Sequence, residues 1–207
     1  MPTPTPRPGD RDVAFAVAAL ADRLPVELRP LARVAYNYRW AWADDGGEVF
    51  AAIDADRWAR VGGNPVRLLS ETDAGILAHA AAQPGLADRA SALAALIDGD
   101  LAREAAGHVP VGHPVAFLCA EFAVHASLPI YSGGLGVLAG DILKEASDLA
   151  LPMVAVGLMY RTGYFHQRLD TRGYQHEFWL DSDPERLPCV PLTDAAGVPL
   201  SVTVPVD

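Results

Sequence analysis

The sequence predicts an α/β fold, because two short apolar runs flank a glycine-rich segment and an amphipathic helix. The runs at 114–119 and 153–159 have the unbroken apolar pattern of strands that are buried on both faces. Between them, apolar residues recur at helical spacing over 137–149, directly after three glycines at 133–136. Strand, glycine loop, helix and strand form one βαβ unit, so we expect the strands to be parallel neighbours joined by a right-handed crossover.

The glycine loop is the part of this unit that suggests chemistry. Gly133, Gly134 and Gly136 would allow backbone conformations with positive φ and the close approach of a ligand. The helix that follows begins with N–H groups that have no acceptor inside the helix, at the positive end of the helix dipole. We therefore expect a phosphate group or a sugar oxygen to bind at this loop.

Composition limits the class of protein. At 207 residues, with 51% hydrophobic and 20% charged residues, the chain has room for one or two globular domains with a substantial core. Its net charge is −10 and it has no run of lysine or arginine, which argues against nucleic acid or an anionic membrane as a partner. No segment has the roughly 18 apolar residues of a membrane span. Cys119, inside the first expected strand, and Cys189 lack metal-ligand spacing, and we interpret both as reduced thiols of a cytoplasmic protein.

Residues 11–106 are expected to form an all-helical N-terminal domain, preceded by a disordered, proline-rich tail at 1–10. Its second helix carries apolar and aromatic side chains at steps of three and four residues. Aromatic residues at this spacing are more often core than ligand-binding, yet Trp40 and Trp42 could also stack on sugars. The expected helices cover 12–24, 28–42, 48–55, 73–82 and 86–105, and turns that contain glycine or proline separate them.

Residues 107–207 are expected to be a second domain, entered through a glycine- and proline-containing linker at 107–112. Beyond the βαβ unit, residues 161–179 alternate on both sides of the turn sequence at 170–173, which predicts a β-hairpin. Residues 198–206 alternate again and are expected to form a strand. Because the chain stops within that pattern, we expect this domain to be incomplete at its C-terminal end.

These residues carry a resemblance to a known family. CAEF at 119–122, SLPIYSGGLGVLAGDILKEASDL at 127–149 and GLMYRTGYFHQRLDTRGYQ at 157–175 resemble the α-glucan (glycogen or starch) phosphorylases, specifically their shorter bacterial and archaeal branch. YNYRWAW at 36–42 and the GNPVRLL turn within 62–69 resemble the helical domain that precedes the catalytic part in that branch. Such phosphorylases are much longer and have two Rossmann-like domains that face each other across a cleft, the arrangement called GT-B. The likeness covers about residues 11–207 of this chain and only the front portion of the family.

The resemblance implies a function and a site. The family transfers a terminal α-1,4-linked glucose of a glucan to inorganic phosphate, releasing glucose 1-phosphate, and the phosphate of its cofactor, pyridoxal 5′-phosphate, serves in proton transfer. By this match, Gly133 and Gly134 would lie at the cofactor, and the backbone amides of Gly134, Leu135 and Gly136 would face the phosphate and the glucose unit that is cut. Glu121 matches the acidic residue of the family's EF motif near the cofactor, which makes it the candidate catalytic residue.

The match also has departures and one absence. Ala123 stands where the longer enzymes have a tyrosine, and Ala126 and Ile142 replace a glutamate and a histidine that are usual in the short branch. The family holds its cofactor as a Schiff base on a lysine of the second domain. The one lysine of this chain, Lys144, has the ordinary position of a solvated helix residue. The resemblance therefore implies that the chain alone is inactive and does not hold the cofactor.

Other interpretations of individual residues stay open. Glu121 and His125, four residues apart, could form an acid/base pair or a structural hydrogen bond. His166 and His176 could pair across the hairpin, but they lack the further ligands that a metal site needs.

Rival functions are considered as well. The spacing Gly134-x-Gly136-x-x-x-Gly140 imitates the dinucleotide fingerprint of an NADP-dependent oxidoreductase, although residues 120–132 separate it from the preceding strand. A GT-B glucan synthase that uses a nucleotide sugar and a non-catalytic glucan-binding remnant are the remaining alternatives.

Overall fold

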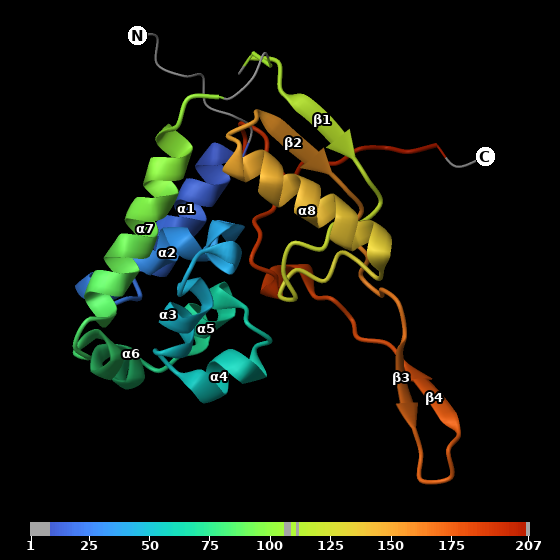
Figure 1. The fold of residues 1–207 in the computed structure, drawn as a ribbon, viewed down its shortest axis with the longest axis horizontal. Coiled ribbons are helices and arrows are strands. Elements are labelled where there is room, and N and C mark those ends of the chain that lie inside the picture. Colours follow the sequence, from blue (N-terminus) through green and yellow to red (C-terminus); the bar gives the residue numbers. More distant parts are fainter. Residues whose placement is uncertain (1–8, 106–108, 111, 206–207) are drawn as a thin grey trace.

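The computed structural model describes residues 9–105, 109–110 and 112–205, and it has a helical block joined to a smaller part that contains the strands (Figure 1). The helical block comprises the helices up to α7, and the strand-containing part follows it in the sequence. Residues 1–8 of the tail expected at 1–10, and residues 107, 108 and 111 of the linker expected at 107–112, lie outside the described residues. The chain mixes helices with small sheets, which is compatible with the predicted α/β class.

Local sequence explains where several helices of the block begin. The side chains of Asp54, Asn64 and Asp73 cap α4, α5 and α6 by accepting hydrogen bonds from backbone N–H groups of the first turn. Proline is the first residue of α2 and of α5, where its missing N–H has no helical acceptor to lose. The elements of the block are α1 (Asp10–Ala21), η1 (Val26–Leu28), α2 (Pro30–Ala35), η2 (Tyr38–Trp42), α3 (Gly46–Ala51), α4 (Ala55–Arg60), α5 (Pro65–Glu71), α6 (Ala74–Ala81) and α7 (Leu86–Ala102).

The core of the block is apolar and aromatic. Helix α2 packs against both α1 and α7, and its Leu31 and Val34 are fully buried. The Trp40 ring is 2% exposed and packs edge-on against Phe50 and Trp58, at centroid distances of 5.3 and 5.8 Å. Trp40 is therefore a core residue, which favours the packing interpretation of this side chain over stacking on sugar.

The single helix expected over 28–42 is wrong. The segment is divided into η1, α2 and η2, because Pro30 starts a new helix and Asn37 adopts an extended conformation with φ −130°. The Asn37 side chain then caps η2 by accepting a hydrogen bond from the Arg39 N–H at 2.9 Å. A hydrophobic period spanning three short helices thus resembles one long helix in the sequence.

The boundaries around the glycines at 46 and 47 also differ from the prediction. The helix expected over 48–55 is α3, which already ends at Ala51, and a separate helix, α4, begins at Ala55; Gly46 is the first residue of α3 instead of a break. A Cβ at residue 46 would lie 2.0 Å from the Trp40 carbonyl oxygen, so this glycine permits close packing. Helix α7 ends at Ala102, earlier than the expected residue 105.

The predicted βαβ unit is present. Strands β1 (Val115–Leu118) and β2 (Met153–Val156) are parallel neighbours, with Val115 opposite Met153 and Leu118 opposite Val156. Helix α8 (Gly134–Asp148) connects them and packs against β2. Cys119 lies just beyond the end of β1, not inside it.

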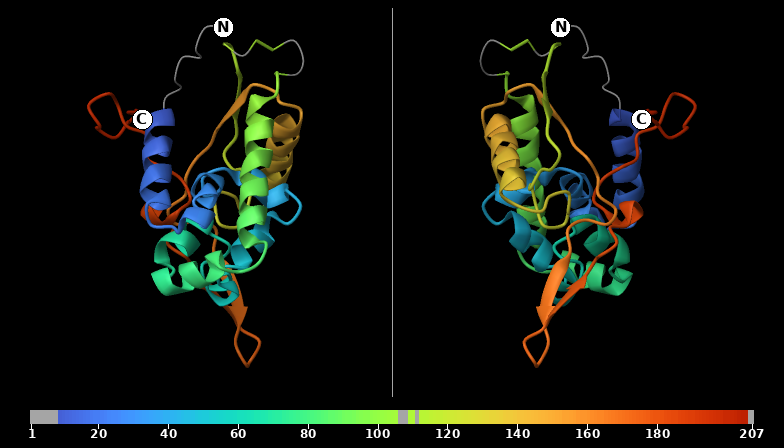
Figure 2. Two further views of the ribbon diagram at one scale, coloured as in Figure 1. Left: turned by 90° about the vertical axis from the view of Figure 1, so that its left-hand side faces the viewer. Right: turned by 90° about the vertical axis from the view of Figure 1, so that its right-hand side faces the viewer.

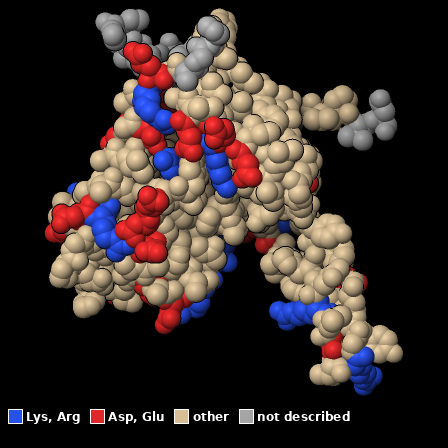
Figure 3. Space-filling view, in the orientation of Figure 1, with Lys and Arg blue, Asp and Glu red and all other residues tan. Residues whose placement is uncertain are grey.

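The two strands are not buried on both faces, contrary to the expectation. Leu118 is 72% exposed, Val156 is 52% exposed, and Leu138 on α8 is 62% exposed. Two strands and one helix cannot bury all their apolar faces against each other. An apolar surface therefore remains over β1 and α8, and Figure 3 shows few charged side chains on the side of the molecule where β1 lies.

The predicted hairpin is present and projects from the rest of the chain (Figure 1, Figure 2). Strands β3 (His166–Leu169) and β4 (Gln175–Phe178) are antiparallel. Their turn contains Gly173 with φ 84°, and the Asp170 carboxylate accepts backbone N–H bonds from Arg172 and Tyr174 at 2.8 and 2.9 Å. The turn chemistry read from the sequence is therefore confirmed.

The C-terminal segment contradicts the strand expected at 198–206. As far as residue 205, where the described chain ends, this segment forms no strand and takes part only in an isolated bridge between Thr193 and Pro199. After η3 (Pro184–Arg186), the chain returns to α1, where Asp12 accepts hydrogen bonds from the N–H and hydroxyl of Thr193. A search for membrane-spanning helices in the described part of the chain finds none of sufficient length and apolarity.

Candidate functional site

The segment 119–133 forms a folded loop that leads from β1 to α8 and lies against the helix. The backbone N–H of Phe122 donates to the Ile130 carbonyl at 3.1 Å, which closes the loop on itself. The N–H of Ala123 donates to the Gly136 carbonyl at 2.8 Å, which fixes the loop to the first turn of α8. Phe122 is buried at 3% exposure and stacks edge-on against Phe117 of β1. We call residues 119–133 the site loop.

Glu121 lies near the start of this loop and holds the backbone at the end of the loop. One carboxylate oxygen accepts hydrogen bonds from the N–H of Ser132 at 2.7 Å and of Gly133 at 3.3 Å. The same oxygen would be 3.0 Å from a Cβ at residue 136. The sequence singled out Glu121 but not Ser132 or its N–H, because a backbone donor leaves no signal in the side-chain pattern.

The glycines at the start of α8 divide into two kinds. A Cβ at Gly133 or Gly134 would meet nothing within 4 Å, so this side of the loop is open to a ligand. A Cβ at Gly136 would lie 2.6 Å from Tyr131 Cβ, and one at Gly140 would lie 2.1 Å from the Ala123 carbonyl oxygen. Gly136 and Gly140, two glycines of the spacing that imitates a dinucleotide fingerprint, thus form the face of α8 on which the site loop packs.

The expected use of positive φ at these glycines is wrong. Gly133 has φ −166° and ψ −156°, an extended conformation that other residues also adopt, and Gly134 and Gly136 are helical. Glycine at 133 and 134 leaves the backbone open, and glycine at 136 lets the site loop pack closely against α8; none of the three forms a left-handed turn. The first helical hydrogen bond runs from the Val137 N–H to the Gly133 carbonyl at 3.3 Å. The N–H groups of Gly134, Leu135 and Gly136 precede it and therefore have no acceptor in their own helix.

His125 does not pair with Glu121 and is instead packed into the helical block. Its ring lies 4.8 Å from Trp40 and 6.1 Å from Tyr38, centroid to centroid. Its Nδ1 lies 3.0 Å from the hydroxyl of Ser127, which in turn lies 3.1 Å from the Tyr38 hydroxyl. Burial lowers the pKa of His125 below its usual 6.5, and the positive charge of Lys144 lowers that pKa further. Both alternatives for Glu121 and His125 are therefore wrong, because His125 makes its hydrogen bond with Ser127 and Glu121 accepts from Ser132 and Gly133.

The residues present do not fit the Schiff-base anchor of pyridoxal phosphate. Lys144 is ten residues beyond Gly134 on α8, about 15 Å along the helix axis from the glycine loop. Its ammonium lies 3.8 Å from the Asp141 carboxylate, and its side chain is 29% exposed. The open amides of the loop suit the phosphate end of such a group, and the chain offers no lysine near them.

The other sequence candidates have structural roles. The His166 ring stacks on Phe178 at 5.3 Å, and His176 lies 3.3 Å from the Asp170 carboxylate, so the two histidines do not pair. Among the described residues no group of three or more metal-ligating side chains comes together. The indole N–H of Trp42 donates to Asp148 at the end of α8, at 3.1 Å.

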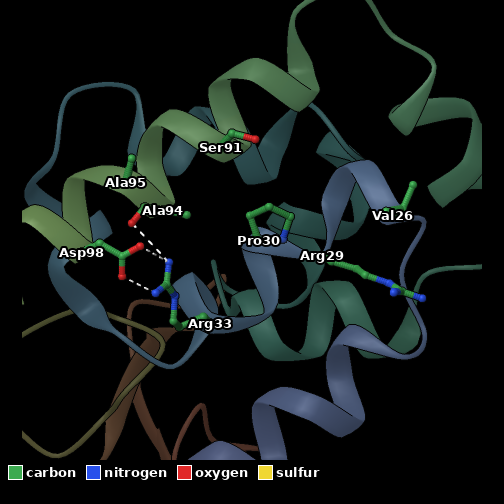
Figure 4. Close-up of a pocket in the computed structure, with 8 residues that line it drawn as sticks. All are labelled: Val26, Arg29, Pro30, Arg33, Ser91, Ala94, Ala95 and Asp98. Carbon is green, nitrogen blue, oxygen red and sulfur yellow. Dashed lines mark hydrogen bonds and ion pairs between the residues drawn. The ribbon is translucent and has the colours of Figure 1, made fainter.

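A cavity of about 560 Å³ lies elsewhere, on the surface of the helical block between α2 and α7 (Figure 4). Arg33 borders it and is already paired with the Asp98 carboxylate and the Ala94 carbonyl. The cavity is open and mostly apolar at its wall, and the glycine loop does not line it. The glycine loop remains the candidate site.

Comparison with known proteins places the chain in a family. Residues 24–128, just over half of the chain, match a family described as a protein of unknown function (DUF3417). The chain belongs to the DUF3417 family. Its DUF3417 region contains the helical block except α1 and most of the site loop, and it ends before the glycines of α8.

Relatives with names extend the similarity beyond the DUF3417 region. The chain is 42% identical to the glycogen phosphorylase of Mycobacterium tuberculosis over 192 residues, which are 87% of this chain and 22% of the relative. It is 36% identical to the maltodextrin phosphorylase of Thermococcus litoralis over 92% of this chain and 23% of the relative. A glycogen phosphorylase of Aquifex aeolicus is 34% identical over 79% and 23%. The resemblance to the α-glucan phosphorylases is thereby confirmed.

The chain spans about a fifth of the length of these relatives. No solved structure matches it at a significant level.

Proposed function

We propose that this chain is the N-terminal part of an α-glucan phosphorylase, which releases glucose 1-phosphate from α-1,4-glucan with inorganic phosphate. The observation that carries the proposal is the similarity to glycogen and maltodextrin phosphorylases over most of the chain. In this proposal, residues 107–207 begin a Rossmann-like domain of the GT-B arrangement, behind a helical domain at 11–106. The parallel pair β1–β2 and the exposed apolar surface over β1 and α8 support it, because further strands and helices would cover that surface.

In this proposal the chain supplies one wall of the active site. The amides of Gly134, Leu135 and Gly136 bind phosphate oxygens, because they are the first N–H groups of α8 and carry the positive end of its dipole. Gly133 and Gly134 are open on the outer side, so a phosphate of the substrate or of the cofactor can reach the backbone. Glu121 acts by orienting the loop through the N–H groups of Ser132 and Gly133.

Pyridoxal phosphate would supply proton transfer at its phosphate, and its lysine would come from residues outside this chain. The opposite wall of the cleft would also come from residues outside this chain. Because the reaction needs both walls to exclude water and to align phosphate with the anomeric carbon, the chain by itself is expected to be inactive.

The test is a titration of the ¹⁵N-labelled chain with inorganic phosphate, followed by NMR. We expect shifts that saturate at the amides of Gly134, Leu135 and Gly136. Gly134→Val should abolish them without unfolding the chain, because a Cβ at 134 meets nothing within 4 Å. Gly99→Val is the matched control, since Gly99 on α7 is equally open and distant in sequence from the loop. Phosphate-dependent shifts that miss these amides, or that survive Gly134→Val, would refute the assignment of the phosphate site.

A further inference from the structure

The helical block contacts the site loop through a buried polar cluster. Ser127 of the loop is 7% exposed, and its hydroxyl lies between the Tyr38 hydroxyl at 3.1 Å and His125 Nδ1 at 3.0 Å. Burial raises the pKa of Tyr38, so its hydroxyl stays protonated and keeps this contact at neutral pH. A buried polar group is costly unless it is paired, which makes this arrangement specific for one position of the loop.

The His125 ring is inserted into the aromatic core of the block. It packs edge-on against Trp40 at 4.8 Å, and a Cβ at Gly63 would lie 3.1 Å from its Cε1 atom. Gly63 has φ +69° and follows α4, so the turn after that helix forms the opposite side of the slot. The His125 ring, packed in the core of the block, thus anchors the site loop to the block.

The other end of α8 is also attached to the block. Asp148 accepts the indole N–H of Trp42 at 3.1 Å, and Arg39 lies 3.8 Å from Asp148 and 2.7 Å from Asp100. Arg103, directly after α7, donates to the carbonyls of Ser147 and Asp148 at 2.9 and 2.6 Å. These carbonyls belong to the last turn of α8, where a cation also interacts favourably with the helix dipole.

From these contacts we infer that the helical block is a brace that sets the position of the glycine loop. Helix α8 is about 22 Å long, and the block holds its C-terminal end directly and its N-terminal end through the site loop. With two separate attachments, neither the tilt nor the position of the helix along its axis is free. Tyr38, His125 and Trp42 are positioning residues, since each acts through its contacts with the site loop, the helical block or α8.

The inference rests on the proposed function only for the role of the loop as a phosphate site. The bracing itself is a property of the chain and has its own readout, the hydrogen exchange of the Ser132 and Gly133 amides. Both amides are bonded to Glu121 in the braced loop, so they should be protected from exchange.

The experiment compares three single variants of the chain by NMR-detected hydrogen exchange. Tyr38→Phe removes the hydroxyl that contacts Ser127, and Trp42→Phe removes the N–H that contacts Asp148, while both keep an aromatic ring. Tyr36→Phe is the matched control, because it removes a hydroxyl from the same block two residues away without touching the Ser127 contact. We expect exchange at Ser132 and Gly133 to be about threefold to tenfold faster in Tyr38→Phe and Trp42→Phe than in Tyr36→Phe. Core amides of α2 and α7 should be unchanged.

Two results would overturn the inference. One is loop exchange in Tyr38→Phe and Trp42→Phe that equals that of Tyr36→Phe. The other is an equal increase at the loop and in the α2 and α7 core, which would mean general destabilisation. Should Tyr38→Phe not fold, Trp42→Phe decides, because it removes only a contact with the exposed Asp148 at the far end of α8. Faster loop exchange without any phosphate-induced shift in the wild-type chain would support the brace and overturn the phosphate site alone.

Discussion

The close approach of Gly140 to the site loop gives a sharp prediction for stability. A Cβ at residue 140 would lie 2.1 Å from the carbonyl oxygen of Ala123 and 2.7 Å from its carbonyl carbon, whereas real Cβ atoms essentially never come within 3.0 Å of another group. Both contacts are with backbone atoms, so no rotation of a side chain relieves them. In Gly140→Ala either the loop or α8 must therefore move.

The size of the effect follows from two opposing contributions. Alanine is better than glycine inside a helix by about 1 kcal/mol. Overpacking of a well-packed contact costs about 1–3 kcal/mol, and we take the upper end because the partner is backbone. The free energy of unfolding should therefore fall by about 2 kcal/mol, which for a chain of this size lowers Tm by about 4–8 °C. Gly134→Ala is the matched control and should not be destabilised, because its Cβ meets nothing within 4 Å.

The assay is thermal and urea unfolding of the three proteins, followed by far-UV circular dichroism. The urea m-values should agree, so that the difference lies in the midpoint and not in the extent of unfolding. If Gly140→Ala were as stable as the wild type, the site loop would not lie on this face of α8. The division of the glycines into open and packed ones would then be wrong.

Three further outcomes are expected. The pKa of His125 is lowered in the folded state, so the unfolded chain binds a proton at a higher pH than the folded chain does. The free energy of unfolding should therefore fall as pH drops below about 6.5. In urea titrations between pH 7 and 5, His125→Gln should remove this dependence of the free energy of unfolding on pH. Borohydride treatment of the chain with pyridoxal phosphate should leave no stoichiometric adduct on Lys144, which mass spectrometry of the digested protein checks. Glu121→Gln should keep the loop amides protected from hydrogen exchange, because an amide oxygen still accepts their N–H bonds, whereas Glu121→Leu should not.

The elements that depend on local sequence could be predicted. The βαβ unit, the hairpin with its Asp170 and Gly173 turn, and the N-cap at Asp73 all follow from patterns within a few residues. The broken helix over 28–42 could not, because its apolar period continues across the interruptions at Pro30 and Asn37.

The location of the candidate site could be predicted from the sequence, but the tertiary contacts that form it could not. Gly134 and Gly140 look alike in the sequence, and only the return of the site loop onto α8 makes one open and the other packed. The place of His125 was equally hidden, since its ring packs against Tyr38 and Trp40, which lie more than 80 positions earlier in the sequence. A pairing of that kind depends on the tertiary fold, which a local pattern does not contain.

The proposed function is that this chain forms the N-terminal part of an α-glucan phosphorylase. The direct test is glucose 1-phosphate release, from glycogen and inorganic phosphate, by a chimera in which this chain replaces the 192 matched residues of the M. tuberculosis glycogen phosphorylase. We expect turnover in the chimera, its loss with Gly134→Val, and its retention with Gly99→Val. A folded chimera that carries pyridoxal phosphate and releases no more glucose 1-phosphate than a protein-free control would refute the proposed function.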